Sequence, residues 1–257
     1  MSQVAAPLRT ISNSDFSQRL GRVTGIAFGI GTQLLFLWTV VHLFLFLRYG
    51  GWHEYPKAWL VDLLLAVCFA VPHSILLAPP VSKWLRRWIP SGLQGSLHCT
   101  TSCLTLLAMF HYWGRMEIEV WHATGWVEQA ILVGFYGSWV ALLYSLYCTG
   151  LGYQTGLTQW WYWFRQTPAP KREFVTRGAF RYMRHPVYMS FLGLIWFTPV
   201  MTLDHAILTV VWTAYIYAGS YFKDRRLLKF IGEPYYEYGK RIWGLPIIGF
   251  GSLRFFR

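Results

Sequence analysis

The sequence predicts an all-α integral membrane protein with six transmembrane helices, and three observations lead to that fold class. Hydrophobic residues make up 54% of the 257-residue chain and charged residues only 13%, about half the charged share of a typical soluble domain. Apolar runs of about 20 residues, the length that crosses a bilayer, recur along the chain. Basic residues gather in alternate loops between these runs. No separate soluble segment, repeat or low-complexity tract is visible, so residues 1–257 are expected to form a single polytopic domain.

Six apolar segments are the candidate spans, and they divide the chain into an N-terminal four-helix part (residues 1–150) and a C-terminal part (residues 151–257). The third segment is the weakest, because Gln94, His98 and several Ser and Thr dilute it, and the fifth is short. The first 22 residues are polar, which predicts an uncleaved signal anchor and not a cleaved signal peptide. The segments are Val23–Leu47, Ala58–Leu77, Leu93–Trp113, Val127–Cys148, Pro186–Thr202 and Ala206–Phe222.

The charges of the connecting loops predict the orientation in the membrane. The loop after the fourth segment holds six basic residues against Glu173, whereas the loop between the last two segments holds only Asp204. Lysine and arginine concentrate in cytoplasmic loops. Both termini and the loop that contains Arg184 are therefore expected in the cytoplasm, with the protein in a bacterial inner membrane. The net charge of +12 belongs to these loops, and no basic soluble domain remains to bind nucleic acid.

The fifth and sixth segments are expected to form a tight antiparallel hairpin, because only a few residues around Thr202–His205 join them. The cytoplasmic ends of such a hairpin lie side by side, which brings Arg184 close to the cluster Lys223–Arg226. Amphipathic helices are expected beside it. The aromatic stretch 156–165 suits the bilayer surface, and Gly232 separates two short helices after the last span. A cytosol-facing pocket at the base of the hairpin follows.

Arg184, His185 and Pro186 form the entrance of the fifth segment and are the first candidates for chemistry. Proline is well tolerated in the first turn of a helix, so the span is expected to begin at Pro186. The free N–H groups of that turn form an anion site, and Arg184 adds a permanent charge whose donors suit a carboxylate. For the tripeptide alone, a basic anchor with a proline helix start remains the alternative interpretation.

Two motifs in the last third of the chain carry a family resemblance. Residues 175–188 read VTRGAFRYMRHPVY and match the pattern V-T-x-G-x-[YF]-x-x-x-R-H-P-x-Y. Residues 227–242 read LLKFIGEPYYEYGKRI and resemble the tail L-x4-G-E-x-Y-x-x-Y-x-x-R-V. In this order and spacing they resemble the isoprenylcysteine carboxyl methyltransferase superfamily. The resemblance implies a membrane enzyme that binds S-adenosylmethionine as its cofactor, in a pocket formed by the hairpin and cytosolic amphipathic helices of a methyltransferase core at residues 151–257.

The resemblance and the residue chemistry together indicate a set of site residues. Arg184 is a candidate stabiliser of a thiolate, and His185 a candidate base or cofactor contact. His73 is the candidate for a substrate-side role, because a polar residue within a span is a functional candidate; interhelical hydrogen bonding is its alternative. Scattered histidines give no sign of a metal site. The cofactor-binding candidates are Val175, Gly178, Tyr182, Arg184, His185, Pro186, Tyr188, Asp224, Arg225 and Tyr235.

Features at residues 73–84, 156–161 and 198–205 are more similar to the bacterial methanethiol S-methyltransferases of that superfamily. They imply methyl transfer to a small thiol, from methanethiol to dimethyl sulfide, with membrane lipid as the other partner. The alternatives are methylation of a prenylcysteine carboxylate or other lipophilic acceptor, an NADPH-linked membrane reductase, and a non-enzymatic membrane protein of the same fold. One departure stands out: Lys223 and Asp224 occupy positions where the superfamily usually has two glutamates.

Overall fold

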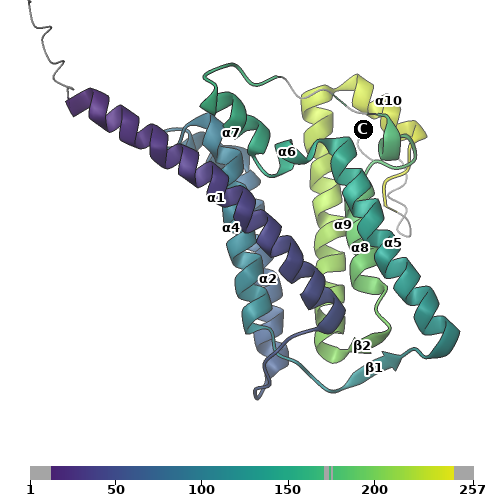
Figure 1. Ribbon diagram of the computed structural model, residues 1–257. Helices are drawn as coiled ribbons and strands as arrows, with labels where there is room; N and C mark the ends of the chain where they lie inside the picture. The colour runs from purple at the N-terminus through teal and green to yellow at the C-terminus, as the bar shows by residue number, and fades with distance from the viewer. Residues whose placement is uncertain (1–12, 171–173, 175, 246–257) are drawn as a thin grey trace, which may run out of the picture.

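The computed structural model describes residues 13–170, 174 and 176–245, which form a bundle of long helices (Figure 1). The first twelve residues of the polar segment before the first span, the cofactor candidate Val175 and the end of the C-terminal tail lie outside the described residues. The elements are α1 (Asn13–Tyr49), α2 (Ala58–Leu77), α3 (Pro79–Leu85), α4 (Ser91–Tyr112), β1 (Glu119–His122), α5 (Gly125–Thr149), α6 (Leu151–Gln154), α7 (Leu157–Phe164), the 3-10 turn η1 (Gly178–Arg181), α8 (Pro186–Trp196), β2 (Val200–Thr202), α9 (Leu203–Ile231) and α10 (Glu233–Arg241).

Three helices of the described part are long and apolar enough to cross a membrane: α1 from Leu20 onward, α2 and α5. The bounds of α2 are those that the sequence predicts, and α5 extends the predicted fourth span by a short stretch at each end. Large apolar side chains such as Leu34 of α1 and Val133 of α5 are exposed on these helices. Contiguous exposed apolar surface of this kind suits lipid. These are the features of a membrane protein.

The fifth predicted span, Pro186–Thr202, is helical only as far as Trp196. Pro199 cannot continue a helix, because its ring removes a hydrogen-bond donor and clashes with the preceding turn. The residues that follow it form the strand β2, and Leu203 already begins α9. The link between α8 and α9 is therefore residues 197–202, and not the stretch Thr202–His205 that the sequence indicates.

Two short strands make the expectation of an all-α chain wrong at one end of the bundle. β1 pairs antiparallel with β2, with Trp121 opposite Met201 and His122 opposite Val200. The indole N–H of Trp121 also donates to the Thr198 carbonyl at 3.1 Å. Figure 1 shows this small sheet beneath α8 and α9, at the end away from α10. The pairing of β1 with β2 joins the connection between α4 and α5 to the connection between α8 and α9.

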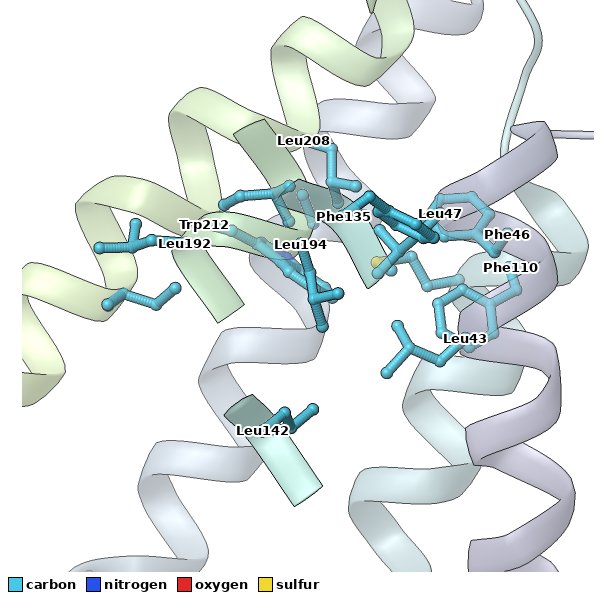
Figure 2. Close-up of a cluster of buried hydrophobic side chains, with 14 of the residues drawn as sticks. Leu43, Phe46, Leu47, Phe110, Phe135, Leu142, Leu192, Leu194, Leu208 and Trp212 are labelled. Carbon is cyan, nitrogen blue, oxygen red and sulfur yellow. The ribbon is translucent and has the colours of Figure 1, made fainter. Parts of the chain in front are cut away.

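A buried apolar cluster lies between α8 and α9 on one side and α1, α4 and α5 on the other (Figure 2). The ring of Phe46 stacks on that of Phe110 with 4.7 Å between centroids. Leu194 and Leu208 are fully buried on α8 and α9, and van der Waals packing of such side chains holds membrane helices together. This packing holds α8 and α9 against the rest of the bundle and so positions the residues at the start of α8.

The aromatic segment α7 forms the predicted short surface helix and packs closely on α1 and α4. The Trp160 indole N–H donates to the Gly25 carbonyl at 3.1 Å. Gly156, which precedes α7, has φ +77, and a Cβ there would lie 2.2 Å from the Ser96 backbone nitrogen. Only glycine satisfies both the left-handed conformation and that close approach.

Candidate active site

Arg184 is a buried connector between three segments of the chain, with 3% of its surface exposed. Its Nη1 donates to the Gly239 carbonyl at 2.9 Å and to the Ile242 carbonyl at 2.7 Å. Its Nη2 lies 3.2 Å from Oδ2 of Asp224. The backbone N–H of Arg184 donates to the Trp243 carbonyl at 2.8 Å. One residue thus joins the entrance of α8 to the end of α10 and to α9.

Asp224 is the acceptor at the centre of this cluster. Its Oδ1 accepts a hydrogen bond from the Tyr235 hydroxyl at 2.5 Å and lies 2.9 Å from Nε2 of His185. Burial alone raises the pKa of the Asp224 carboxyl, but the contacts with His185, Arg184 and Tyr235 outweigh it and hold that pKa below its ordinary value. Asp224 is therefore ionised at neutral pH and pairs with the permanent charge of Arg184.

His185 caps the start of α8 and is almost fully buried, with 1% of its surface exposed. Its ring stacks on that of Tyr188 with centroids 5.5 Å apart. Burial lowers the pKa of His185 more than the neighbouring carboxylate of Asp224 raises it, so the imidazole is neutral at pH 7. Its Nδ1 is buried and has no hydrogen-bond partner within residues 13–170, 174 and 176–245. A buried polar atom in this state costs about 1–3 kcal/mol, and a ligand that bonds it recovers that energy.

The remaining candidates around this cluster differ in exposure. Pro186 opens α8 as predicted. Tyr182, 75% exposed, and Arg225 lie at the surface. Gly178 has φ +62, and a Cβ there would come within 2.7 Å of Cys148 Sγ, so this glycine provides close packing between η1 and α5. The structure therefore gathers Arg184, His185, Pro186, Tyr188, Asp224 and Tyr235 into one buried unit, with Tyr182 and Arg225 at its margin.

Lys223, the departure from the superfamily pattern, lies next to this unit. Its Nζ is 4.9 Å from the centroid of the Tyr188 ring, a distance at which an ammonium is attracted to an aromatic face. Lys223 also acts electrostatically on His185, since its positive charge is one of the causes that lower the pKa of that imidazole. The chain thus places a cation beside Tyr188 in addition to the paired Arg184.

His73 belongs to a second polar cluster, between α2, α4 and α9. Its Nδ1 lies 3.0 Å from Oγ of Ser102, and the Ser102 hydroxyl donates its single proton to the His98 carbonyl at 2.8 Å. Ser102 Oγ must therefore accept from His73, so Nδ1 carries the proton and Nε2 keeps a lone pair. The His73 ring also packs on His98, with 4.7 Å between centroids, and lies beside Tyr215 of α9.

Two carboxylates that sequence reasoning did not assign to any site stabilise the opposite end of the bundle. Asp62 Oδ1 accepts from the Gly114 N–H at 2.8 Å, and Asp204 accepts from the Trp113 indole at 3.3 Å and the Met116 N–H at 3.2 Å. The sequence shows both acidic residues near helix starts. It does not show that the backbone N–H groups of Gly114 and Met116, in a distant loop, donate to them. Among the described residues, no three His, Cys, Asp or Glu side chains group closely enough to hold a metal ion.

A cavity of about 1710 Å³ opens away from both clusters, between the start of α1, the start of α4 and α7. Arg22, Trp88, Gln159 and Trp163 are among its lining residues. None of the site residues predicted from the sequence lines it. The polar groups predicted to act on substrate and cofactor lie instead on α2, α8, α9 and α10 and in the segment that leads into α8.

Comparison with known proteins found relatives over most of the chain. The chain is 31% identical over 187 residues to methanethiol S-methyltransferase 2 of Bradyrhizobium diazoefficiens, a match that covers 72% of each protein. It is 28% identical over 252 residues to methanethiol S-methyltransferase of Crocosphaera subtropica, covering 94% of this chain and 97% of the relative. It is also 27% identical over 168 residues to nurim of Rattus norvegicus, covering 62% and 63%. No family model and no solved structure matches.

Proposed function

Because this chain belongs to the isoprenylcysteine carboxyl methyltransferase superfamily of membrane proteins, we propose that it uses S-adenosylmethionine to methylate a small thiol. Methanethiol is the expected acceptor and dimethyl sulfide the expected product. The names of the relatives support thiol methylation. The observation that carries the proposal is the buried unit around Arg184 and Asp224, which presents an unsatisfied His185 Nδ1 beside exposed cationic and aromatic residues.

We infer that six segments cross a bacterial inner membrane, with Pro186–Thr202 (α8 and the residues that follow it) and the first part of α9 as the last two. Both termini and α10 then lie in the cytoplasm. The alternation of basic and non-basic loops supports this topology. It places the Arg184–Asp224 unit at the cytoplasmic surface, where a charged cofactor has access from water.

The residues fit S-adenosylmethionine, which supplies a methyl group on a positively charged sulfur when bound. His185 Nδ1 is a buried atom without a polar partner in the described residues, whereas His185 Nε2 lies 2.9 Å from Asp224 Oδ1. Tyr182 and Arg225 lie exposed at the margin. We assign cofactor contact to these three residues and to the first turn of α8, whose N–H groups favour an anionic carboxylate. The guanidinium of Arg184 is engaged by Asp224 and two carbonyls, so Arg184 positions His185 and the C-terminal helix.

Methyl transfer from a sulfonium requires an aligned nucleophile more than it requires acid–base chemistry. A thiol reacts as its thiolate, and nearby cations favour that form. Positions 223 to 226 read Lys-Asp-Arg-Arg, and the single acid among them, Asp224, is paired with Arg184. The balance of charge beside the site is thus positive, as thiolate chemistry requires.

Calorimetry on the purified protein tests the proposal. S-adenosylmethionine is expected to bind the wild-type protein, whereas NADPH is not. His185→Ala is expected to weaken that binding at least tenfold, while Arg87→Ala, on an exposed residue away from the cluster, serves as the matched control. Cells that express the protein and receive methanethiol should release dimethyl sulfide into the headspace. Absence of S-adenosylmethionine binding contradicts the proposal, and tight NADPH binding favours a reductase.

A further inference from the structure

Gly219 of α9 leaves an opening beside the Arg184–Asp224 unit. A Cβ built at this glycine meets only the Tyr188 hydroxyl, at 3.8 Å, which is ordinary van der Waals contact. Most of the other glycines within helices meet an atom closer than 3 Å. The absence of a side chain at Gly219 is therefore not required by packing, and it leaves free volume on this face of the helix.

Three side chains surround this opening, which we call the Gly219 notch. Tyr215 and Lys223 lie one turn before and one turn after Gly219 on α9, so they share its face. Tyr188 reaches it from α8, with its hydroxyl over Gly219 and its ring 4.9 Å from Lys223 Nζ. The Lys223 ammonium thus lies at one end of the Gly219 notch and the Tyr215 ring at the other end. The Tyr188 ring lies at its side.

The Tyr188 hydroxyl has no hydrogen-bond partner within the described parts of the chain. By contrast, the hydroxyls of Tyr215, Tyr235 and Tyr238 are each bonded, to Ser74, Asp224 and the Phe180 carbonyl. A phenol donor that points into an opening beside an ammonium is suited to an anion.

Tyr215 forms the wall opposite Lys223 and is fixed from the neighbouring helix. Its hydroxyl lies 3.0 Å from Oγ of Ser74 on α2, and its ring lies 6.5 Å from that of His73. The Gly219 notch therefore connects the two polar clusters: Asp224 adjoins its Lys223 end, and His73 adjoins its Tyr215 end. A ligand in the notch has the cofactor candidates on one side and the predicted substrate-side histidine on the other.

We propose that the acceptor thiol binds as its thiolate in the Gly219 notch, with the Tyr188 hydroxyl and the Lys223 ammonium as its polar contacts. This inference rests on the proposed function. The thiol proton passes to water on binding; the thiolate sulfur then bonds to the methyl carbon as the bond from that carbon to the sulfonium sulfur breaks. A thioether and S-adenosylhomocysteine remain. Lys223 in place of an acidic residue is then the feature that adapts this chain to an anionic acceptor.

Filling the opening is the first test, since it is designed to leave the fold intact. Gly219→Leu places a side chain in the Gly219 notch and replaces glycine in a helix interior by a better helix former. Gly31→Leu, on an exposed face of α1 where a Cβ also meets nothing within 4 Å, is the matched control. Both variants and the wild-type protein are loaded with S-adenosylhomocysteine, which cannot donate a methyl group, and titrated with methanethiol in a calorimeter.

Gly219→Leu is expected to weaken methanethiol binding at least tenfold and to leave the affinity for S-adenosylhomocysteine within twofold of wild type. Gly31→Leu is expected to match the wild type in both. Wild-type thiol affinity in Gly219→Leu overturns the inference while the proposed function stands. A wild-type protein that binds S-adenosylmethionine but methylates no thiol overturns both.

The charge of Lys223 is tested by the protons released on binding. Titrations in two buffers with different heats of ionisation should show release of about one proton per methanethiol bound to the wild-type protein, because the thiol enters as thiolate. Lys223→Met is expected to lower that release and to raise the KM for the thiol about tenfold, and Lys223→Arg to restore both. Binding without proton release overturns the thiolate assignment. The other titratable groups around Lys223 are Arg184, His185, Tyr188, Tyr215, Asp224 and Arg226.

Discussion

The two polar clusters that the sequence predicts as catalytic are built in opposite ways. Around Asp224, a buried carboxylate is matched by Arg184, His185 and the Tyr235 hydroxyl. Around His73, all groups are neutral and each contact is a single hydrogen bond or a ring contact. The first cluster joins α8, α9 and α10, whereas the second joins α2 to α4 and α9.

The two clusters differ in how much the fold depends on each of their residues. Removing one partner of a buried ion pair leaves an uncompensated charge and costs about 3–5 kcal/mol. Removing one neutral hydrogen bond costs about 1 kcal/mol. The Arg184–Asp224 unit is thus a structural support that holds His185, the proposed cofactor contact, whereas a single change in the His73 cluster is expected to cost less stability.

The largest expected effect comes from Arg184→Ala. The substitution removes the bonds to Gly239 and Ile242 and leaves Asp224 buried without its cation, so the free energy of unfolding should fall by about 3–5 kcal/mol. Thermal unfolding in detergent, followed by size-exclusion chromatography, measures the loss. Arg225→Ala, on the exposed neighbour of Asp224, is the control and should unfold near the wild-type temperature. A wild-type Tm in Arg184→Ala would show that α10 is held by other contacts.

His73→Phe is expected to affect catalysis far more than stability, because it removes only one neutral hydrogen bond, to Ser102. Phenylalanine keeps the ring contacts with His98 and Tyr215 but removes the Nε2 lone pair. If His73 has the substrate-side role, kcat/KM for the thiol falls about 10²-fold, with the Tm close to wild type. Steady-state rates of dimethyl sulfide formation provide the measurement. An unchanged kcat/KM would show that the His73 cluster serves only the packing between helices.

Much of the fold could be predicted from the sequence because membrane helices are governed by local composition. The bounds of α2, the helix break at Gly232 and the start of α8 at Pro186 were all visible in residue type alone. The β1–β2 pairing was not, since its strands have three and four residues and no long alternation to reveal them. Short pairings of this kind depend on contacts between distant loops.

The candidate site could be predicted only as a list of residues. The motif singled out Arg184 for binding a ligand, yet the carbonyls that occupy its guanidinium belong to residues 55 and 58 positions later. No pattern of residue types shows which backbone oxygen a side chain will reach. The tautomer of His73 likewise follows from the Ser102 hydroxyl on a different helix. Residue types in the sequence indicated which side chains could act chemically. Their hydrogen-bond partners could be identified only from the three-dimensional structure.

Acid is expected to destabilise the Arg184–Asp224 unit, because His185 and Asp224 both have shifted pKa values there. The pKa of His185 is lower in the folded protein than its unfolded value of about 6.5. Its contribution to stability is therefore full above about pH 6.5 and is lost as the pH falls from there toward the folded pKa, by at most about 1.4 kcal/mol per pH unit. The depressed pKa of Asp224 adds a second loss below about pH 4, its unfolded value.

The Tm of the wild-type protein should fall between pH 7.5 and 5, and His185→Asn should flatten that dependence. The measurement is a series of unfolding curves in one detergent at constant ionic strength. Arg87→Ala, on an exposed residue away from the cluster, is the control and should keep the wild-type slope. An equally steep slope in His185→Asn would assign the acid sensitivity to another residue.

The smallest expected effect is that of Ser102→Ala, which removes the acceptor of the His73 Nδ1 proton. The loss should be about 1 kcal/mol, the cost of one neutral hydrogen bond. Ser138→Ala is the control for the helix itself, because the Ser138 hydroxyl also donates to a carbonyl four residues earlier, at 2.7 Å, without a histidine partner. In a double-mutant cycle, Ser102→Ala should cost less when His73 is already phenylalanine. Equal costs in both backgrounds would mean that the Ser102 hydroxyl contributes only through its bond to the His98 carbonyl. The His73 tautomer would then not be fixed by a residue of α4.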